Sequence, residues 1–172
     1  MSHSVSMNHV KAILGESVLA CLAATICALL IDVPVWAMFI GWIAFFTRGI
    51  TARDGLINLV CVLGGLIIGI AAGLASAAVA PYLGALTITP IALTATLIVL
   101  SLKLLPVFNN LLGFFLGLVC YFASGLPPTL DTFVELAIAS SLGILGGLLA
   151  SLMHKRWGGP NRPTTGSSIS LP

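Results

Sequence analysis

Charged residues are scarce in this sequence, and their scarcity excludes an ordinary soluble fold. Asp, Glu, Lys and Arg make up 7% of the 172 residues, whereas soluble domains contain roughly 25%. Hydrophobic residues make up 59%, so the chain cannot cover its surface with polar groups. Long uncharged runs are typical of transmembrane helices, because a bilayer core of ~30 Å requires about 20 helical residues. We therefore predict an all-α, polytopic membrane protein whose main partner is the lipid bilayer.

Sequence motifs for chemistry are also lacking. The chain has no P-loop, no GxSxG elbow and no HExxH motif. Its four cysteines form no CxxC pair and no cluster with histidine. The formal net charge of +2 comes from few residues and gives no reason to expect a nucleic-acid partner. We expect no enzymatic activity, no cofactor and no metal site.

Proline, glycine and charged residues divide the chain into six apolar segments. Each proline in these breaks lies at or near a helix start, where its missing N–H group costs nothing. We predict six transmembrane helices, at about 12–31, 34–48, 55–80, 86–103, 107–124 and 130–153.

All seven basic residues fall on one side of this six-span arrangement. They are Lys11, Arg48, Arg53, Lys103, Lys155, Arg156 and Arg162. Cytoplasmic loops carry the Lys/Arg excess, so both termini are expected in the cytoplasm. We predict a cytoplasmic segment 1–11, a single membrane domain 12–156, and a cytoplasmic tail 157–172 whose Gly, Pro and Ser content predicts disorder.

An internal repeat relates two of the apolar segments. The stretch "FIGWIAFFTRG" at 39–49 is followed 76 positions later by "FLGLVCYFASG" at 115–125. Three spans separate the copies, and an odd number of spans reverses the direction of crossing. We therefore predict two three-helix repeats, 12–80 and 86–153, in inverted topology, an arrangement shared by many transporters and channels.

Small residues recur at every fourth position in the third helix of each repeat. Such spacing lets helix backbones approach closely, which stabilises helix pairs in lipid. We favour packing within one subunit over a seam between copies, although a homo-oligomer stays open. The helix-packing positions are Gly65, Gly69, Gly73, Gly143 and Gly147.

The segments 34–48 and 107–124 are candidates for a solute path. Segment 34–48 is short for a bilayer, so it either spans thinly or is re-entrant, and short segments at matching positions of two repeats indicate a transport site. The alternative is that their aromatic residues are interfacial anchors or fill a core. The candidate path residues are Trp42, Phe45, Asn109, Asn110 and Tyr121.

Two acidic residues lie within the predicted spans. Glu16 is about one turn into the first span and Glu135 about one turn into the last. Ionisable groups inside a membrane are functional candidates because of their insertion cost. Snorkelling to the interface or capping is an equally good interpretation, and Glu16 could pair with Lys11 or Arg48.

Three stretches resemble a known family. "WAMFIGWIAFF" at 36–46, "APYLG" at 80–84 and "LPVFNNLLGFFLGLVCYFA" at 105–123 are similar to the small bacterial inner-membrane family of unknown function typified by YcdZ. The resemblance covers about residues 30–150. It implies a multipass protein of the bacterial inner (cytoplasmic) membrane, and it implies no activity, substrate or binding residue.

Two functional hypotheses follow. In the first, the protein is a channel or facilitator for a small neutral or weakly acidic solute, as the repeat and the short segments indicate. In the second, it is a non-transporting scaffold or regulatory protein that acts through helix–helix contacts, because no buried charge pair suited to coupling is evident.

The predicted orientation can be tested with a reporter fused after Pro172. Because every basic residue falls on one predicted side, the reporter should be active on the cytoplasmic side, as measured with paired phosphatase and fluorescent-protein fusions. A periplasmic reporter would contradict the six-span arrangement.

Overall fold

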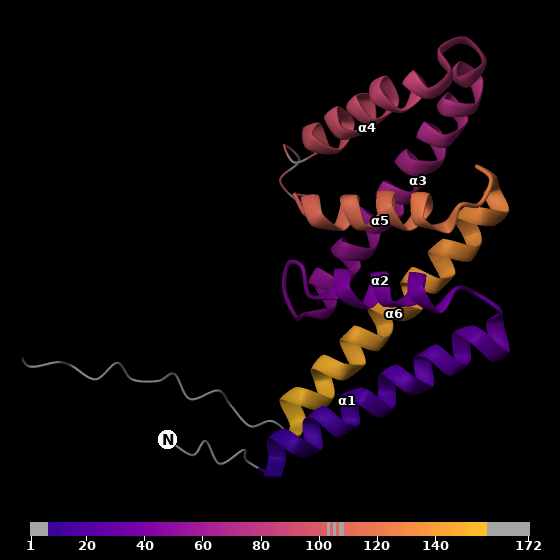
Figure 1. Cartoon of the computed structure of the whole chain (residues 1–172). Coiled ribbons are helices and arrows are strands. Elements are labelled where there is room, and N and C mark those ends of the chain that lie inside the picture. Colours follow the sequence, from indigo (N-terminus) through magenta and orange to yellow (C-terminus); the bar gives the residue numbers. More distant parts are fainter. Residues whose placement is uncertain (1–6, 103, 105, 107–108, 158–172) are drawn as a thin grey trace, which may run out of the picture.

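In a computed structural model, the described part of the protein consists of six α-helices and two short helical turns (Figure 1). The structure describes residues 7–102, 104, 106 and 109–157. The elements are α1 (Met7–Ile26), the π-turn η1 (Cys27–Ile31), α2 (Val35–Phe45), α3 (Ala52–Leu83), the 3₁₀ turn η2 (Gly84–Thr87), α4 (Ile88–Leu102), α5 (Leu111–Ser124) and α6 (Leu130–Trp157). No strand occurs within the described ranges.

Each predicted segment overlaps one of these helices, but several predicted ends differ from those in the structure. α1 begins at Met7, so it takes in part of the predicted segment 1–11, and α6 continues to Trp157. α3 begins at Ala52 because the Thr51 side chain caps it, accepting a hydrogen bond from the Asp54 backbone N–H at 3.1 Å. The rest of the predicted disordered tail, 158–172, lies outside the described residues.

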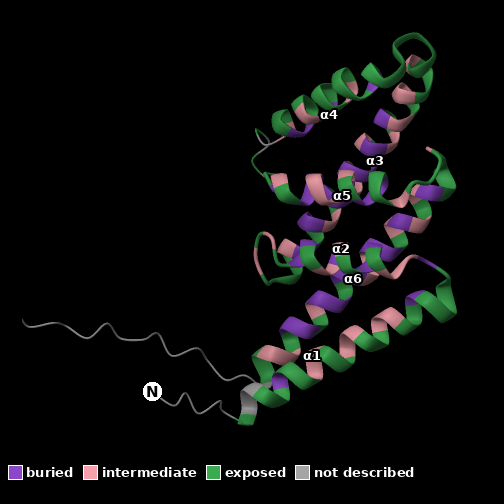
Figure 2. Cartoon of the chain, viewed as in Figure 1, coloured by how far each residue is buried: buried purple, intermediate pink, exposed green. Residues whose placement is uncertain are grey.

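The long apolar stretches are suited to a membrane. Among the residues that the structure describes, three helical stretches are long and apolar enough to cross one: Val10–Ile31, Ala52–Leu102 and Leu130–Arg156. The second contains α3, η2 and α4, and the chain reverses its direction at η2, where Gly84 has a φ of 54° (Figure 1). α1 and α4 are the most exposed helices (Figure 2). Their surfaces are apolar: Leu14 of α1 is 60% exposed and Ile88 of α4 74%.

Consecutive helices run in alternating directions (Figure 1). The start of α1, the α2–α3 loop, the end of α4, the start of α5 and the end of α6 lie on one side of the molecule, which we call the basic side. The basic residues in the described part of the chain belong to these helix ends and loops: Lys11, Arg48, Arg53, Lys155 and Arg156.

The helices of one half of the chain pack mainly on those of the other half. α2 packs on α6, and α5 packs on α3. α1 lies against α6, and α4 lies against α3. α3 and α6 also cross, and α2 touches α5. The core between them includes the fully buried side chains of Met38, Val62, Leu66 and Leu136.

α2 and α6 meet backbone to backbone. A Cβ atom on Gly41 of α2 would collide with the backbone oxygen of Ser140. Conversely, a Cβ atom on Gly143 of α6 would collide with the backbone oxygen of Met38. Each helix therefore needs a glycine where the other passes, and we call this contact the α2–α6 seam.

α5 and α3 meet in the same way. A Cβ atom on Gly117 of α5 would collide with the backbone oxygen of Val62, and one on Gly65 of α3 with the backbone oxygen of Phe114. We call this contact the α3–α5 seam. The α5 residues Phe114 and Gly117 lie 76 positions after Met38 and Gly41 of α2. The α3 residues Val62 and Gly65 lie 78 positions before Ser140 and Gly143 of α6.

Filling one seam should unfold the protein. Gly117→Val places a side chain against the Val62 carbonyl, and neither backbone can move without shifting a whole helix. We expect a loss of about 3 kcal/mol or more, measured as unfolding of the detergent-purified protein. Ala123→Val is the matched control, because Ala123 is exposed on the same helix. Equal effects of the two substitutions would contradict the seam.

Candidate functional site

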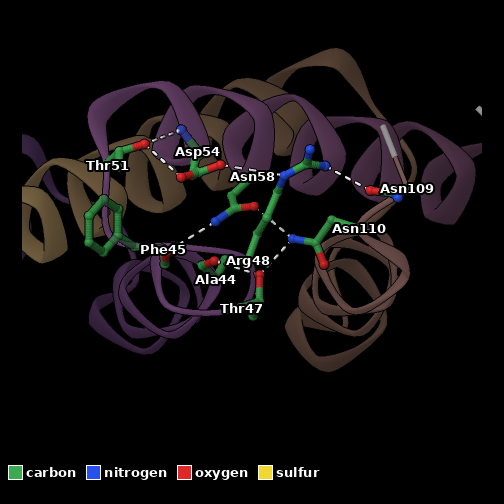
Figure 3. Close-up of polar contacts among 9 residues, drawn as sticks. All are labelled: Ala44, Phe45, Thr47, Arg48, Thr51, Asp54, Asn58, Asn109 and Asn110. Atoms are coloured by element: carbon green, nitrogen blue, oxygen red, sulfur yellow. Dashed lines mark hydrogen bonds and ion pairs between the residues drawn. The ribbon is translucent and has the colours of Figure 1, made fainter. Parts of the chain in front are cut away.

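A buried group of amide side chains lies where α2 ends and α5 begins (Figure 3). Asn58 of α3 is fully buried, and Asn110 is 7% exposed. The Asn110 side-chain N–H donates hydrogen bonds to Asn58 Oδ1 at 2.7 Å and to Thr47 Oγ1 at 2.6 Å. The Asn58 side-chain N–H donates to the backbone oxygen of Phe45 at 3.0 Å. We call Asn58, Asn110 and Thr47 the amide cluster.

Helix ends explain why these residues lie here. The last carbonyl groups of a helix have no partner within it, and Asn58 satisfies the one at Phe45, the last residue of α2. Asn110 is the N-cap of α5, and its Oδ1 accepts a hydrogen bond from the Gly113 backbone N–H at 3.2 Å. The cluster thus joins the end of α2 to the start of α5 through α3.

An ion pair covers the cluster on the basic side (Figure 3). Arg48 Nη1 donates a hydrogen bond to Asn109 Oδ1 at 2.7 Å, and Arg48 Nε lies 3.4 Å from Asp54 Oδ1. The Thr51 hydroxyl donates to the other Asp54 oxygen at 2.6 Å. Both side chains of the ion pair are partly exposed, so the pair contributes little to stability. The hydrogen bond from Arg48 to Asn109 joins the α2–α3 loop to the start of α5.

The chemistry available at this site is hydrogen bonding by neutral groups. Amides both donate and accept, and none of the three cluster side chains titrates in the physiological range. Among the described residues, no group of three or more His, Cys, Asp or Glu side chains could hold a metal ion. The cluster therefore presents hydrogen-bond donors and acceptors that carry no formal charge.

The structure separates the five candidate path residues into two groups. Asn109 and Asn110 lie at the amide cluster, at the start of α5. The prediction that they lie inside that helix was wrong, because α5 begins at Leu111, where Asn110 caps it. Phe45 reaches the cluster with its backbone oxygen only, while its buried ring packs against Gly55 and Gly147.

Tyr121 and Trp42 lie away from the cluster. The Tyr121 side chain, 5% exposed, fills the surface left open by Gly69 and Gly73 of α3. The half-buried ring of Trp42 lies on Gly146 of α6. These aromatic rings thus occupy hollows at helix crossings.

The two candidate acidic residues have different surroundings. Glu16 pairs with His154 of α6, with Oε1 3.0 Å from the ring Nδ1. This contact thus pairs Glu16 with a residue that was not among the suggested partners, Lys11 and Arg48, because α1 lies against α6. Glu135 is partly buried and makes no hydrogen bond or ion pair with any residue that the structure describes.

The sequence patterns did not point to Asn58, Asp54 or His154 as members of these contacts, and they suggested Arg48 only as a basic residue and a possible partner of Glu16. Arg48 and Asp54 flank the short α2–α3 loop, and this spacing was the one available signal. Nothing in the sequence relates Glu16 to His154, which lie 138 residues apart.

Replacing the buried amide should destabilise the protein. Asn58→Leu removes the side-chain donor to the Phe45 carbonyl and one of the two acceptors of the Asn110 side-chain N–H group. We expect a loss of about 1–2 kcal/mol in detergent unfolding. Thr94→Val should cost less, because the Thr94 hydroxyl bonds only to the Pro90 carbonyl of its own helix, at 2.8 Å. An Asn58→Leu protein as stable as wild type would contradict a structural role for the cluster.

Comparison with known proteins identifies the family and no activity. The family model described as "Protein of unknown function (DUF1097)" matches residues 13–151, which is more than half of the chain. The match covers all or part of every helix from α1 to α6. It does not relate the chain to YcdZ in particular. No curated protein and no solved structure matches the chain. The chain therefore belongs to the DUF1097 family of proteins of unknown function.

Proposed function

We propose that this protein crosses the bacterial inner membrane six times, as two inverted three-helix repeats, and acts as a channel or facilitator for a small neutral or weakly acidic solute. The proposal assigns it no enzymatic activity and no nucleic-acid partner. The observation that carries it is the uncharged amide cluster, buried between the ends of the two short helices.

The matched seams support the inverted repeats. The two halves make corresponding contacts when α1, α2 and α3 are matched with α4, α5 and α6. The α2–α6 contact then corresponds to the α5–α3 contact, and the α1–α6 contact corresponds to the α4–α3 contact. The contacts of α3 with α6 and of α2 with α5 are unchanged by this matching. Both seams use glycine at the same relative positions.

The alternating helix directions support six crossings. α2 and α5 have 11 and 14 residues, or about 16 and 21 Å. α3 and α6 have 32 and 28 residues, or about 48 and 42 Å. Long helices can tilt through a bilayer, whereas short ones must cross it directly or thin it. The gathering of basic residues on one side agrees with a cytoplasmic location of that side.

The amide cluster breaks the symmetry between the halves, and this supports a role beyond packing. The offset of 78 positions between α3 and α6 makes the fully buried Leu136 the counterpart of Asn58. The offset of 76 positions between the first and second halves makes Pro34 the counterpart of Asn110. The fold thus accommodates an apolar residue at the position of Asn58. Buried polar groups in a membrane domain are costly and commonly mark solute pathways. Neutral amides suit a neutral solute.

A specific observation favours the second candidate, a non-transporting scaffold or regulator. Phe45 and Tyr121 are packed into glycine hollows, as in a solid core. Every buried amide of the cluster also has a partner within the chain. A protein with this core would act through contacts of its outer helices.

Solute flux in proteoliposomes distinguishes the two candidates. We expect wild-type protein to raise the permeability to one of a series of small neutral solutes and weak acids, such as glycerol, urea, formamide and acetate. Asn110→Leu should lower that flux about tenfold, as a barrier increase of 1.4 kcal/mol would.

Thr94→Val serves as the control and should leave the flux unchanged, since Thr94 bonds within its own helix. No flux above that of empty liposomes for any solute, with folded wild-type protein, would favour the scaffold.

A further inference from the structure

A pocket of about 290 Å³ lies on the basic side, between α1, the α2–α3 loop and the last turns of α6. Its walls combine two apolar residues with charged and polar ones. The lining residues are Glu16, Phe46, Ile50, Ser151, His154 and Lys155.

The charged residues of the pocket are held in place. Glu16 Oε1 lies 3.0 Å from His154 Nδ1, which joins α1 to α6. Lys155 Nζ donates a hydrogen bond to the Ile50 backbone oxygen at 3.2 Å, which joins α6 to the α2–α3 loop. An ammonium group has three N–H donors, so Lys155 can donate to a ligand while it keeps this bond. Lys155 is the lysine of the lining and supplies its positive charge, while Glu16 lies against the His154 ring.

The counterpart of this pocket in the second half of the chain carries no charge. A second pocket of about 290 Å³ is lined by residues that include Ser76, Ala92 and Phe122. Ala92 and Phe122 follow Glu16 and Phe46 by 76 positions, and Ser76 precedes His154 by 78. Ala92 and Ser76 thus stand where the first pocket has Glu16 and His154. Charged residues are therefore not required to form a pocket at this place in the fold.

The location favours a lipid over a soluble anion. The pocket lies at the end of α6, and Lys11 and Arg156 belong to the same end of the α1–α6 pair. Phe46 is 49% exposed and Ile50 47%, so apolar surface lies beside Lys155. A phospholipid presents this combination, a phosphate joined through glycerol to apolar chains. Basic pockets between helices at a membrane surface are suited to anionic headgroups.

We infer that this pocket binds the phosphate of an anionic phospholipid in the leaflet on the basic side. Lys155 donates to a phosphate oxygen, Phe46 and Ile50 contact the glycerol and the first methylenes, and Glu16 positions the His154 ring as a wall of the pocket. The inference requires the protein to be in a membrane but does not require it to transport anything.

The test is lipid-dependent thermal unfolding of the full chain in a neutral detergent. We expect phosphatidylglycerol to raise the Tm by about 4 °C or more, as a saturating ligand would, and phosphatidylcholine to leave it unchanged. Lys155→Gln should abolish the rise and Lys155→Arg should preserve it. Arg53→Gln, which removes an equal charge from an exposed residue outside the pocket, should keep the rise.

Three results would overturn the inference. These are equal shifts with the two lipids, equal losses from Lys155→Gln and Arg53→Gln, and a full shift with inorganic phosphate alone, which would indicate a soluble anion. Native mass spectrometry of the wild-type protein provides a test without any variant. Phosphatidylglycerol should stay bound with one molecule per chain, and preferential retention of phosphatidylcholine would also overturn the inference.

Discussion

Where α2 crosses α6, and where α5 crosses α3, a glycine on each helix lies against a backbone carbonyl of the other. Apolar side chains give no hydrophobic drive for helix association in lipid, so close backbone packing has to supply it. The two seams join helices of different halves of the chain. Neither half could therefore keep its arrangement without the other, and the short helices α2 and α5 depend on the seams for their positions.

The positions of the large side chains follow from the seams. Next to each crossing, further glycines leave hollows, and Phe45 fills the one at Gly147 while Tyr121 fills the one at Gly69. The same crossings bring the end of α2 close to the start of α5, where helix ends leave backbone groups without partners. Asn58 and Asn110 satisfy those groups. The amide cluster thus lies where α2 ends and α5 begins.

The sequence predicts the helical segments well, because uncharged runs and proline-containing breaks act over a few residues. The repeat at 39–49 and 115–125 could also be found, since its glycine and aromatic spacing survives in the sequence. The exact helix ends could not, as Asn110 shows: its role as the cap of α5 depends on its hydrogen bond to the Gly113 N–H. Local pattern alone did not distinguish a cap from a residue inside the helix.

The sequence by itself determined the helical class, the six apolar segments and the glycine spacing of α3 and α6, because these depend on the composition and period of neighbouring residues. Tertiary structure alone decided which groups meet. Asn110 lies 52 residues from Asn58, and Glu16 lies 138 from His154. Such pairs form only when helices from both halves cross at set angles. One position on a helix then becomes buried and its neighbour exposed, and the local pattern of residues does not encode that choice.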